Sequence, residues 1–228
     1  MEVGWVLKRT IKSFVKRAGR ITSAQRKAIE ECLLDFSFRS QLSFQGENAF
    51  LKHRPLYLEI GFGNGLNLVR QAEYYPGRNF IGCEIYESGI GSTLINLKNR
   101  GISNVRIAVG DALETIEYLS LKSLDGVFIL FPDPWPKKRH NKRRLVNKDF
   151  FKKIGPKMKD HAKIFMTTDD ESYAQAIIEV LAEDTFFENI AGERSFAPRP
   201  SWRESTKFEE RAHRLGNSIF EIIACLKN

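Results

Sequence analysis

The sequence is poor in cysteine and has no long apolar run. Its three cysteines, Cys32, Cys83 and Cys225, are scattered and form no C-x-x-C pair. This pattern excludes a disulfide framework and a spaced zinc site, and it favours a reducing, cytoplasmic location. A membrane span needs roughly 18 consecutive apolar residues, and a signal peptide needs about 7–15 of them near the N-terminus. The sequence contains neither, so no membrane association is expected.

The remaining composition is that of a globular protein. A chain of 228 residues with 42% apolar and 28% charged residues can bury a core without a disulfide or metal to support it. Neither an internal repeat nor a low-complexity segment is present. One large domain is therefore the default expectation.

Positive charge is concentrated in two segments. Residues 1–28 carry a net charge of +7, and the run KKRHNKRR at 137–144 carries +6. The whole chain carries only +8, which leaves the remainder at −5. A charge run is usually a solvated surface, but two dense basic segments with a single acid between them, on an acidic body, favour a polyanionic partner such as nucleic acid.

The hydrophobic pattern predicts strands that alternate with helices. Apolar runs predict strands at 55–60, 79–85, 104–110, 124–131, 162–168, 185–192 and 217–227. Helical spacing predicts helices at 23–34, 66–76, 87–101, 111–120, 147–158 and 170–184. This alternation indicates an α/β fold with a mostly parallel sheet. The last two strands have no expected crossover helix between them, so they should form an antiparallel edge pair.

Acidic residues follow five successive strands. Ligands of open α/β sheets bind at the carboxyl ends of the strands. The acids at those ends are Glu59, Glu84, Asp111, Asp133 and Asp169. We therefore expect an acidic site along that edge of the sheet.

Three glycines, Gly61, Gly63 and Gly65, form a G-x-G-x-G loop between the first strand and its helix. A dinucleotide fingerprint would need glycine at position 66, where this chain has Leu66. With Glu59 just before it, the loop instead fits S-adenosylmethionine, because the ammonium and sulfonium of that molecule favour nearby carboxylates. An ordinary tight turn is the simpler alternative.

Two further acids fit the same nucleoside. Glu84 is placed to accept the ribose hydroxyls, and Asp111 to meet the adenine amino group. Taken singly, each fits an acid at a helix N-terminus somewhat better than a ligand. The joint pattern favours cofactor binding.

Several motifs together resemble the bacterial tRNA (guanine-N7-)-methyltransferase family. The most specific is FPDPWPKKRHNKRRLV, and LEIGFGNG, CEIYESGI, TDDESYA and TKFEERA support it. The lead-in SFVKRAGRITSAQ is also similar, so the resemblance covers about residues 10–225. It implies a Rossmann-like class I methyltransferase fold, with a mostly parallel seven-stranded sheet, an antiparallel edge pair and helices on both faces. We expect a basic N-terminal arm and helix at 1–40 and a single methyltransferase domain at 41–228.

The resemblance also implies an activity and a set of functional residues. The family methylates N7 of the guanosine at position 46 in the tRNA variable loop, using S-adenosylmethionine. Cofactor contacts are implied for Glu59, Glu84, Asp111 and Asp133, with Asp133 also catalytic. Substrate contacts are implied for Lys137, Asp169, Thr206, Lys207, Phe208 and Glu209. RNA contacts are expected from Arg139, His140, Asn141, Lys142, Arg143 and Arg144.

Each of these residues also has a structural interpretation. Asp133 lies between two prolines and could simply form a turn. Asp169 could cap the following helix, and the adjacent Asp170 competes for its substrate role. Thr206 and Glu209 have the spacing of a capping box. His140 has no second metal ligand beside it, so a phosphate contact is expected and no metal.

The function expected from the sequence is therefore methyl transfer to guanine N7 in tRNA, by a monomer or homodimer. Guanine N7 is a bare acceptor lone pair, so it needs no deprotonation before attack. Methylation of another RNA, a small molecule or a protein is one alternative. A non-enzymatic RNA-binding protein with the same fold is another.

Overall fold

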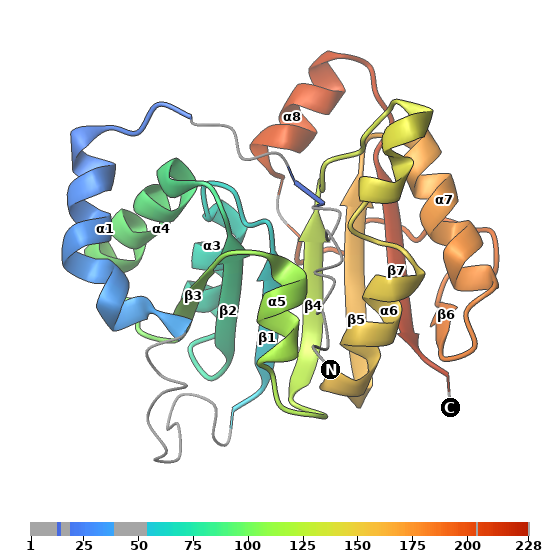
Figure 1. The fold of residues 1–228 in the computed structure, drawn as a ribbon, viewed down its shortest axis with the longest axis horizontal. Coiled ribbons are helices and arrows are strands. Elements are labelled where there is room, and N and C mark those ends of the chain that lie inside the picture. Colours follow the sequence, from blue (N-terminus) through green and yellow to red (C-terminus); the bar gives the residue numbers. More distant parts are fainter. Residues whose placement is uncertain (1–12, 15–18, 39–53, 204, 228) are drawn as a thin grey trace, which may run out of the picture.

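The structure is a computed structural model that describes residues 13–14, 19–38, 54–203 and 205–227. A seven-stranded sheet with the strand order β3-β2-β1-β4-β5-β7-β6 crosses the molecule (Figure 1). Its strands are β1 (Leu56–Ile60), β2 (Asn79–Glu84), β3 (Val105–Val109), β4 (Leu124–Leu130), β5 (Met158–Thr168), β6 (Phe187–Asn189) and β7 (Phe220–Leu226).

The strand directions confirm the expected fold class. Strands β3, β2, β1, β4 and β5 are mutually parallel, and β7 is antiparallel to both β5 and β6. The late strands thus form the predicted antiparallel pair at one edge. The strand order reverses between β1 and β4, which opens a crevice at the carboxyl ends of those two strands.

Helices cover both faces of the sheet. They are α1 (Ser23–Phe36), α3 (Leu66–Tyr74), α4 (Glu87–Asn99), α5 (Ala112–Glu117), α6 (Lys148–Ile154), α7 (Glu171–Ala182) and α8 (Lys207–Arg214), with 3-10 turns η1 (Lys138–Arg143) and η2 (Gly155–Lys157). None of the described helices is long and apolar enough to cross a membrane.

Two apolar cores lie on opposite faces of the sheet. One joins the sheet to α5, α6 and α7, and the other joins it to α1, α3 and α4. Adjacent residues of one strand contribute to different cores, because side chains alternate across a pleated strand. In β4, for example, Val127 and Ile129 belong to the first core and Phe128 to the second.

Helix α1 packs against α4 and is capped by Thr22. Thr22 Oγ1 accepts from the Gln25 backbone N–H, and the Gln25 side chain accepts in return from the Thr22 backbone N–H. A Cβ at Gly91 of α4 would lie 2.7 Å from the Gln25 carbonyl oxygen, so the glycine permits the close approach. The expected basic arm lies almost wholly outside the described residues, as does the segment 39–53 that contains the expected domain boundary.

The structure adds one helix that the hydrophobic pattern did not predict. We expected no crossover helix between the last two strands, but α8 lies between them in the chain, near the carboxyl ends of the parallel strands (Figure 1). Only Glu209 and Ala212 of α8 are buried. The helix therefore has no apolar stripe, and the helical spacing in its sequence is that of charged residues, not of apolar ones.

Candidate functional site

The candidate site lies where the strand order reverses. The glycine loop leaves β1 there, and residues 131–135 leave β4 beside it. Two adjoining pockets occupy this edge. The first, here the Glu84 pocket, has a volume of about 180 Å³, and the second, the Glu59 pocket, has about 500 Å³. Both are lined by Gly61, Gly63, Tyr86, Leu130, Phe131 and Phe208.

The glycine loop adopts a backbone that side chains would disturb. Gly61, Gly63 and Gly65 have φ angles of 70°, 57° and 73°, in the left-handed region that favours glycine. A Cβ at Gly89 of α4 would lie 2.1 Å from the Gly63 carbonyl oxygen, so helix and loop are in direct backbone contact. No atom comes within 4 Å of an added Cβ at Gly61 or Gly63, which leaves the pocket side of the loop open to a ligand.

Glu84 is fixed by three backbone donors. Its carboxylate accepts from the N–H groups of Gly63 at 2.8 Å, Ile85 at 2.7 Å and Tyr86 at 3.1 Å. Burial raises the pKa of Glu84, the three bonds oppose that rise, and the nearby charge of Asp133 adds to it. The carboxylate thus links the end of β2 to the glycine loop and lines the Glu84 pocket.

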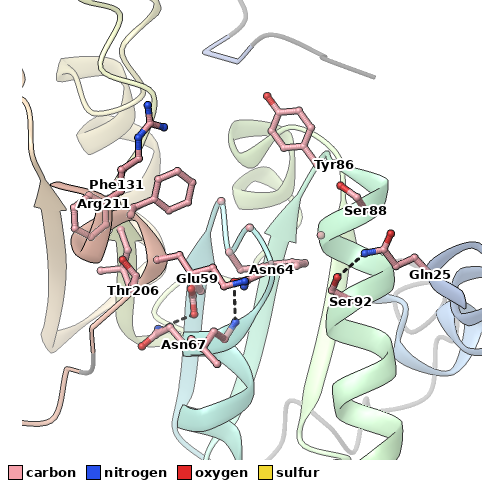
Figure 2. Close-up of a pocket in the computed structure, with 18 of the residues that line it drawn as sticks. Gln25, Glu59, Asn64, Asn67, Tyr86, Ser88, Ser92, Phe131, Thr206 and Arg211 are labelled. Carbon is pink, nitrogen blue, oxygen red and sulfur yellow. Dashed lines mark hydrogen bonds between the residues drawn. The ribbon is translucent and has the colours of Figure 1, made fainter. Parts of the chain in front are cut away.

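Glu59 lies at the floor of the neighbouring Glu59 pocket (Figure 2). It is 3% exposed, and Asn67 Nδ2 donates to its carboxyl oxygen at 2.8 Å. Burial raises the pKa of Glu59 to about 8, despite the Asn67 bond, and the charge of Glu84 contributes to the rise. In the absence of a cationic ligand, Glu59 is therefore mostly protonated at neutral pH.

Asp111 occupies the helix-capping position that the sequence left as an alternative. Its side chain accepts from the Leu113 N–H at 2.8 Å and caps α5. Its neighbours Gly110 and Ala112 line the Glu84 pocket. The residue is thus beside the pocket, with one oxygen engaged by the helix.

Asp133 sits in a strained segment after β4. Three non-glycine residues in the described chain have positive φ, and two of them, Phe131 at 53° and Trp135 at 48°, flank Asp133. Pro132 and Pro134 further restrict the backbone. The segment directs Asp133 into the lining of the Glu84 pocket.

Trp135 and Arg143 hold a piece of the N-terminal segment at this pocket. The Trp135 indole N–H donates to the Ser13 carbonyl oxygen at 3.0 Å, and Arg143 Nη2 donates to that of Phe14 at 3.3 Å. The Arg143 guanidinium lies 4.0 Å from the Trp135 ring centroid. Ser13 and Phe14 also line the Glu84 pocket, so the chain closes over it here.

The basic run is divided between surface and interior. Lys137, Lys138, Arg139, Asn141 and Lys142 are exposed, and η1 presents most of them on its surface. His140 packs edge-on against Trp135, with 5.9 Å between ring centroids. With the side-chain amide of Asn141 oriented so that its nitrogen faces acceptors, that nitrogen donates to the carbonyl oxygens of Trp135 and Lys137 at 3.1 and 3.3 Å.

Arg144 departs from its expected role in RNA contact. It is 5% exposed, and its guanidinium donates to the carbonyl oxygen of Pro134 at 2.9 Å and to the Ser172 side chain at 2.6 Å. It also lies 4.9 Å from the Tyr173 ring centroid and 3.9 Å from an Asp170 oxygen. The Arg144 guanidinium is thus bound by groups inside the protein. Arg144 ties the Asp133 segment to α7 and is not available to a phosphate.

The adjacent acids after β5 have different environments. Asp170 caps α7, accepting from the Tyr173 N–H at 2.7 Å. Asp169 is left outside the cap, and its carboxylate accepts from Asn217 Nδ2 at 3.4 Å. The residue that caps the helix is thus Asp170, and the carboxylate of Asp169 is oriented toward the loop after α8.

The segment at the start of α8 contributes Thr206, Lys207 and Phe208 to the lining of the Glu59 pocket. Thr206 caps the helix, since its side chain accepts from the Glu209 N–H at 3.2 Å. The reciprocal half of the expected capping box is absent. The Glu209 side chain instead faces away from the pocket lining, toward Arg203.

Glu209 therefore differs from the expected substrate contact. It is 2% exposed, and Arg203 donates to its two carboxylate oxygens at 2.6 and 3.1 Å. Arg199 adds an ion pair at 2.9 Å. Burial alone would raise the pKa of Glu209, but the bonds from Arg203 and the charge of Arg199 outweigh it and lower the pKa.

Arg203 is a residue that supports the site and that the sequence did not indicate. It is 2% exposed, bridges Glu209 of α8 to Glu221 of β7, and Glu221 in turn accepts from Thr167 of β5 at 2.8 Å. This network fixes α8 to the sheet edge. No sequence signal marks it, because a single arginine in a proline-rich loop looks like a surface residue.

Comparison with known proteins finds relatives that are named as methyltransferases. A family profile described as "Putative methyltransferase" matches residues 53–222. The tRNA (guanine-N(7)-)-methyltransferase of Vibrio parahaemolyticus is 41% identical over 218 residues, covering 94% of this chain and 91% of that protein. The protein of the same name from Albidiferax ferrireducens is 38% identical over 242 residues and covers 98% of both chains.

Solved structures share the fold at low sequence identity. A precorrin-6y C5,15-methyltransferase from Geobacter metallireducens has a TM-score of 0.51 at 16% identity, covering 83% of this chain and 86% of that one. A 16S rRNA (adenine(1408)-N(1))-methyltransferase from Catenulisporales acidiphilia has a TM-score of 0.52 at 13% identity, covering 78% and 88%. At these identities, the likeness concerns the fold alone.

The raised pKa of Glu59 predicts a pH-dependent cost to stability. Between about pH 4.5 and pH 8 the folded protein keeps a proton that the unfolded chain has lost, so stability falls as the pH rises through this window. Glu59→Gln removes that cost and keeps an acceptor for Asn67. In urea unfolding, the variant should match the parent near pH 5 and exceed it near pH 8.5 by about 1–4 kcal/mol. An equal difference at both pH values would contradict the assignment.

The Arg203 network predicts a second effect on stability. Arg203→Leu leaves Glu209 and Glu221 buried without their shared cation, and we expect it to cost about 3–5 kcal/mol. Arg199→Ala is the matched control, because it removes the partly exposed partner of the same carboxylate and should cost about 1 kcal/mol or less. Urea unfolding at neutral pH measures both. An equal loss of stability in the two variants would show that the effect does not depend on the burial of the Arg203–Glu209 pair.

Proposed function

Because the chain belongs to the tRNA (guanine-N7-)-methyltransferase family, we propose that it transfers a methyl group from S-adenosylmethionine to N7 of a guanosine in tRNA. The finer proposal is that this guanosine is at position 46 of the variable loop. The observation that carries the proposal is the acidic pocket at the sheet edge, whose described lining holds no lysine or arginine, beside a surface rich in arginine and lysine.

The residues of the Glu84 pocket fit S-adenosylmethionine. The described residues that line it include Glu84 and Asp133 but neither lysine nor arginine. Such a lining would repel a pyrophosphate and attract an ammonium or a sulfonium. The open glycine loop, Gly61 to Gly65, supplies backbone surface for close approach of the ligand.

We assign the cofactor contacts as follows. Glu84, held by three backbone N–H groups, retains free lone pairs for the ribose hydroxyls. Glu59 lies near the other end of the loop, where the ammonium would ionise it, and Asp111 lies beside the adenine end. When bound, S-adenosylmethionine supplies a methyl group on a positively charged sulfur.

The chain's own part in catalysis is placement. Guanine N7 attacks without losing a proton, so the main demand is an in-line approach to the methyl carbon. Phe131 and Phe208, whose ring centroids are 6.2 Å apart, line both pockets and support a base at their boundary. Because tertiary contacts of tRNA enclose the target base, local opening of the RNA is expected.

Asp133 is the proposed catalytic residue. Methylation makes the purine cationic, and a carboxylate at the N1 and N2 edge would accept from that edge and stabilise the developing charge. Its position between Pro132 and Pro134, flanked by two strained residues, supports a fixed orientation. A fixed charge needs no reorganisation during the reaction.

The remaining substrate contacts are proposed for Lys137, Asp169, Thr206, Lys207 and Phe208. Lys138, Arg139, His140, Asn141 and Lys142 are proposed to contact tRNA, and Arg143 to do so beside Trp135. For Glu209 and Arg144 we propose structural roles instead, since both are buried and ion-paired. We further propose a cytoplasmic monomer or homodimer, in keeping with three cysteines that form no disulfide.

The direct test is methylation of defined RNA. Incubation with isotopically labelled S-adenosylmethionine and a tRNA transcript should label one guanosine, at position 46, as N7-methylguanosine identified by nucleoside mass spectrometry. A transcript with adenosine at that position is the matched control and should stay unlabelled. Labelling of ribosomal RNA or protein, with tRNA unmodified, would favour the alternative substrates.

The role of Asp133 gives a kinetic prediction. Asp133→Asn keeps the shape but removes the charge, and we expect single-turnover methylation to fall by about 10²–10³-fold. Affinity for tRNA should change much less, and cofactor affinity only modestly. The measurement uses folded protein with saturating tRNA and S-adenosylmethionine. A rate within about threefold of the parent would mean that Asp133 is only a turn residue.

A further inference from the structure

The Glu59 pocket extends well beyond the residues that the proposed reaction uses. Figure 2 shows Phe131, Thr206 and Arg211 on one side of it, with Tyr86, Ser88, Ser92 and Gln25 on the other. At about 500 Å³ it is larger than the Glu84 pocket, which it adjoins through the glycine loop. The far wall is uncharged and polar, since Gln25 Nε2 donates to Ser92 Oγ at 2.9 Å. The near wall is the exposed face of α8.

The side of α8 that lines the Glu59 pocket carries three cations. Lys207, Arg211 and Arg214 are spaced by four and three residues, all are exposed, and all line the Glu59 pocket. Glu209 is turned inward, where Arg203 binds it. The inward acid and outward cations give the pocket wall a net positive charge that the overall composition of α8 conceals.

No carboxylate within the described chain forms an ion pair with Lys207 or Arg211. Arg214 donates through Nε to the Glu210 carbonyl oxygen at 3.4 Å, which leaves its charge uncompensated. The carboxyl group at the pocket floor is Glu59, which is buried and bound by Asn67. Three cations on a helix anchored by Arg203 therefore face an open, polar cavity.

We propose that this face of α8 binds backbone phosphates of the tRNA strand that flanks the target guanosine. Arg211 and Arg214 are the new contacts, and they extend from Lys207 away from the catalytic pocket. A base held beside Phe131 and Phe208, at the boundary of the two pockets, would have its neighbouring phosphates on the Glu59-pocket side, because both rings line both pockets. This inference rests on the proposed function, and it supplies a second RNA contact in addition to the run 137–144.

The test variant is Arg211→Ala with Arg214→Ala. The matched control is Lys98→Ala with Lys152→Ala, which removes two exposed cations from the last turns of α4 and α6. Those helices run back from the carboxyl edge of the sheet, so their last turns lie at the opposite edge. Binding of a tRNA transcript is measured over a range of salt concentrations.

We expect the α8 variant to bind tRNA about tenfold more weakly near 0.1 M salt, with a log–log salt slope lower by roughly 0.7–0.9 for each lost phosphate contact. Its affinity for S-adenosylmethionine and its rate at saturating tRNA should stay within about twofold of the parent. The control should keep the parental slope. The charge-preserving variant Arg211→Lys with Arg214→Lys should restore most of the slope.

A slope that falls equally in the α8 variant and the control would overturn the proposal, because it would reflect overall charge. An unchanged slope in the α8 variant would overturn it as well. If the parent protein itself fails to methylate tRNA, the proposed function is wrong. A parent that methylates tRNA, together with an α8 variant of normal slope, refutes only the role of α8.

Discussion

The reversal of strand order between β1 and β4 is the constraint on which the site depends. Neighbouring parallel strands send their crossover helices in opposite directions at this point, so neither crossover helix covers the sheet edge between them. The glycine loop and the Asp133 segment emerge side by side there. The bond from the Gly63 N–H to Glu84 then ties the loop to the end of β2, and the N–H groups of Ile85 and Tyr86 hold the same carboxylate, so it is positioned by main chain and not by flexible side chains.

The second constraint is electrostatic. An acidic pocket for a cationic cofactor lies next to a surface that must attract a polyanion. If the carboxylates and the cations were paired with one another, neither would attract its ligand. The structure keeps them apart by burial. Glu59 is buried, which raises its pKa, Glu84 is held by backbone donors, and Glu209 is paired with Arg203. The cations of η1 and α8 remain at the surface.

Sequence pattern predicted the sheet, its edge pair and the position of the acidic edge. These features depend on short-range periodicity and on the rule that ligands meet the carboxyl ends of parallel strands. The pattern failed where a side chain's role depends on distant partners. Arg144 shares its run with exposed cations, yet Ser172 and Tyr173 of α7 bind it in the interior. Glu209 fits a capping box, yet an arginine six residues earlier takes its carboxylate.

Helix α8 shows why such partners matter for function as well as for stability. Its hydrophobic content is too low for it to pack as an ordinary amphipathic helix, since only Glu209 and Ala212 are buried. A buried ion pair supplies the attachment instead. Because the anchor uses the acid on the inner face, the outer face is free to carry cations without losing the helix from the sheet. Arg203 thus anchors α8 to the sheet through Glu209 and Glu221, while the cations of the helix remain on the side that lines the pocket.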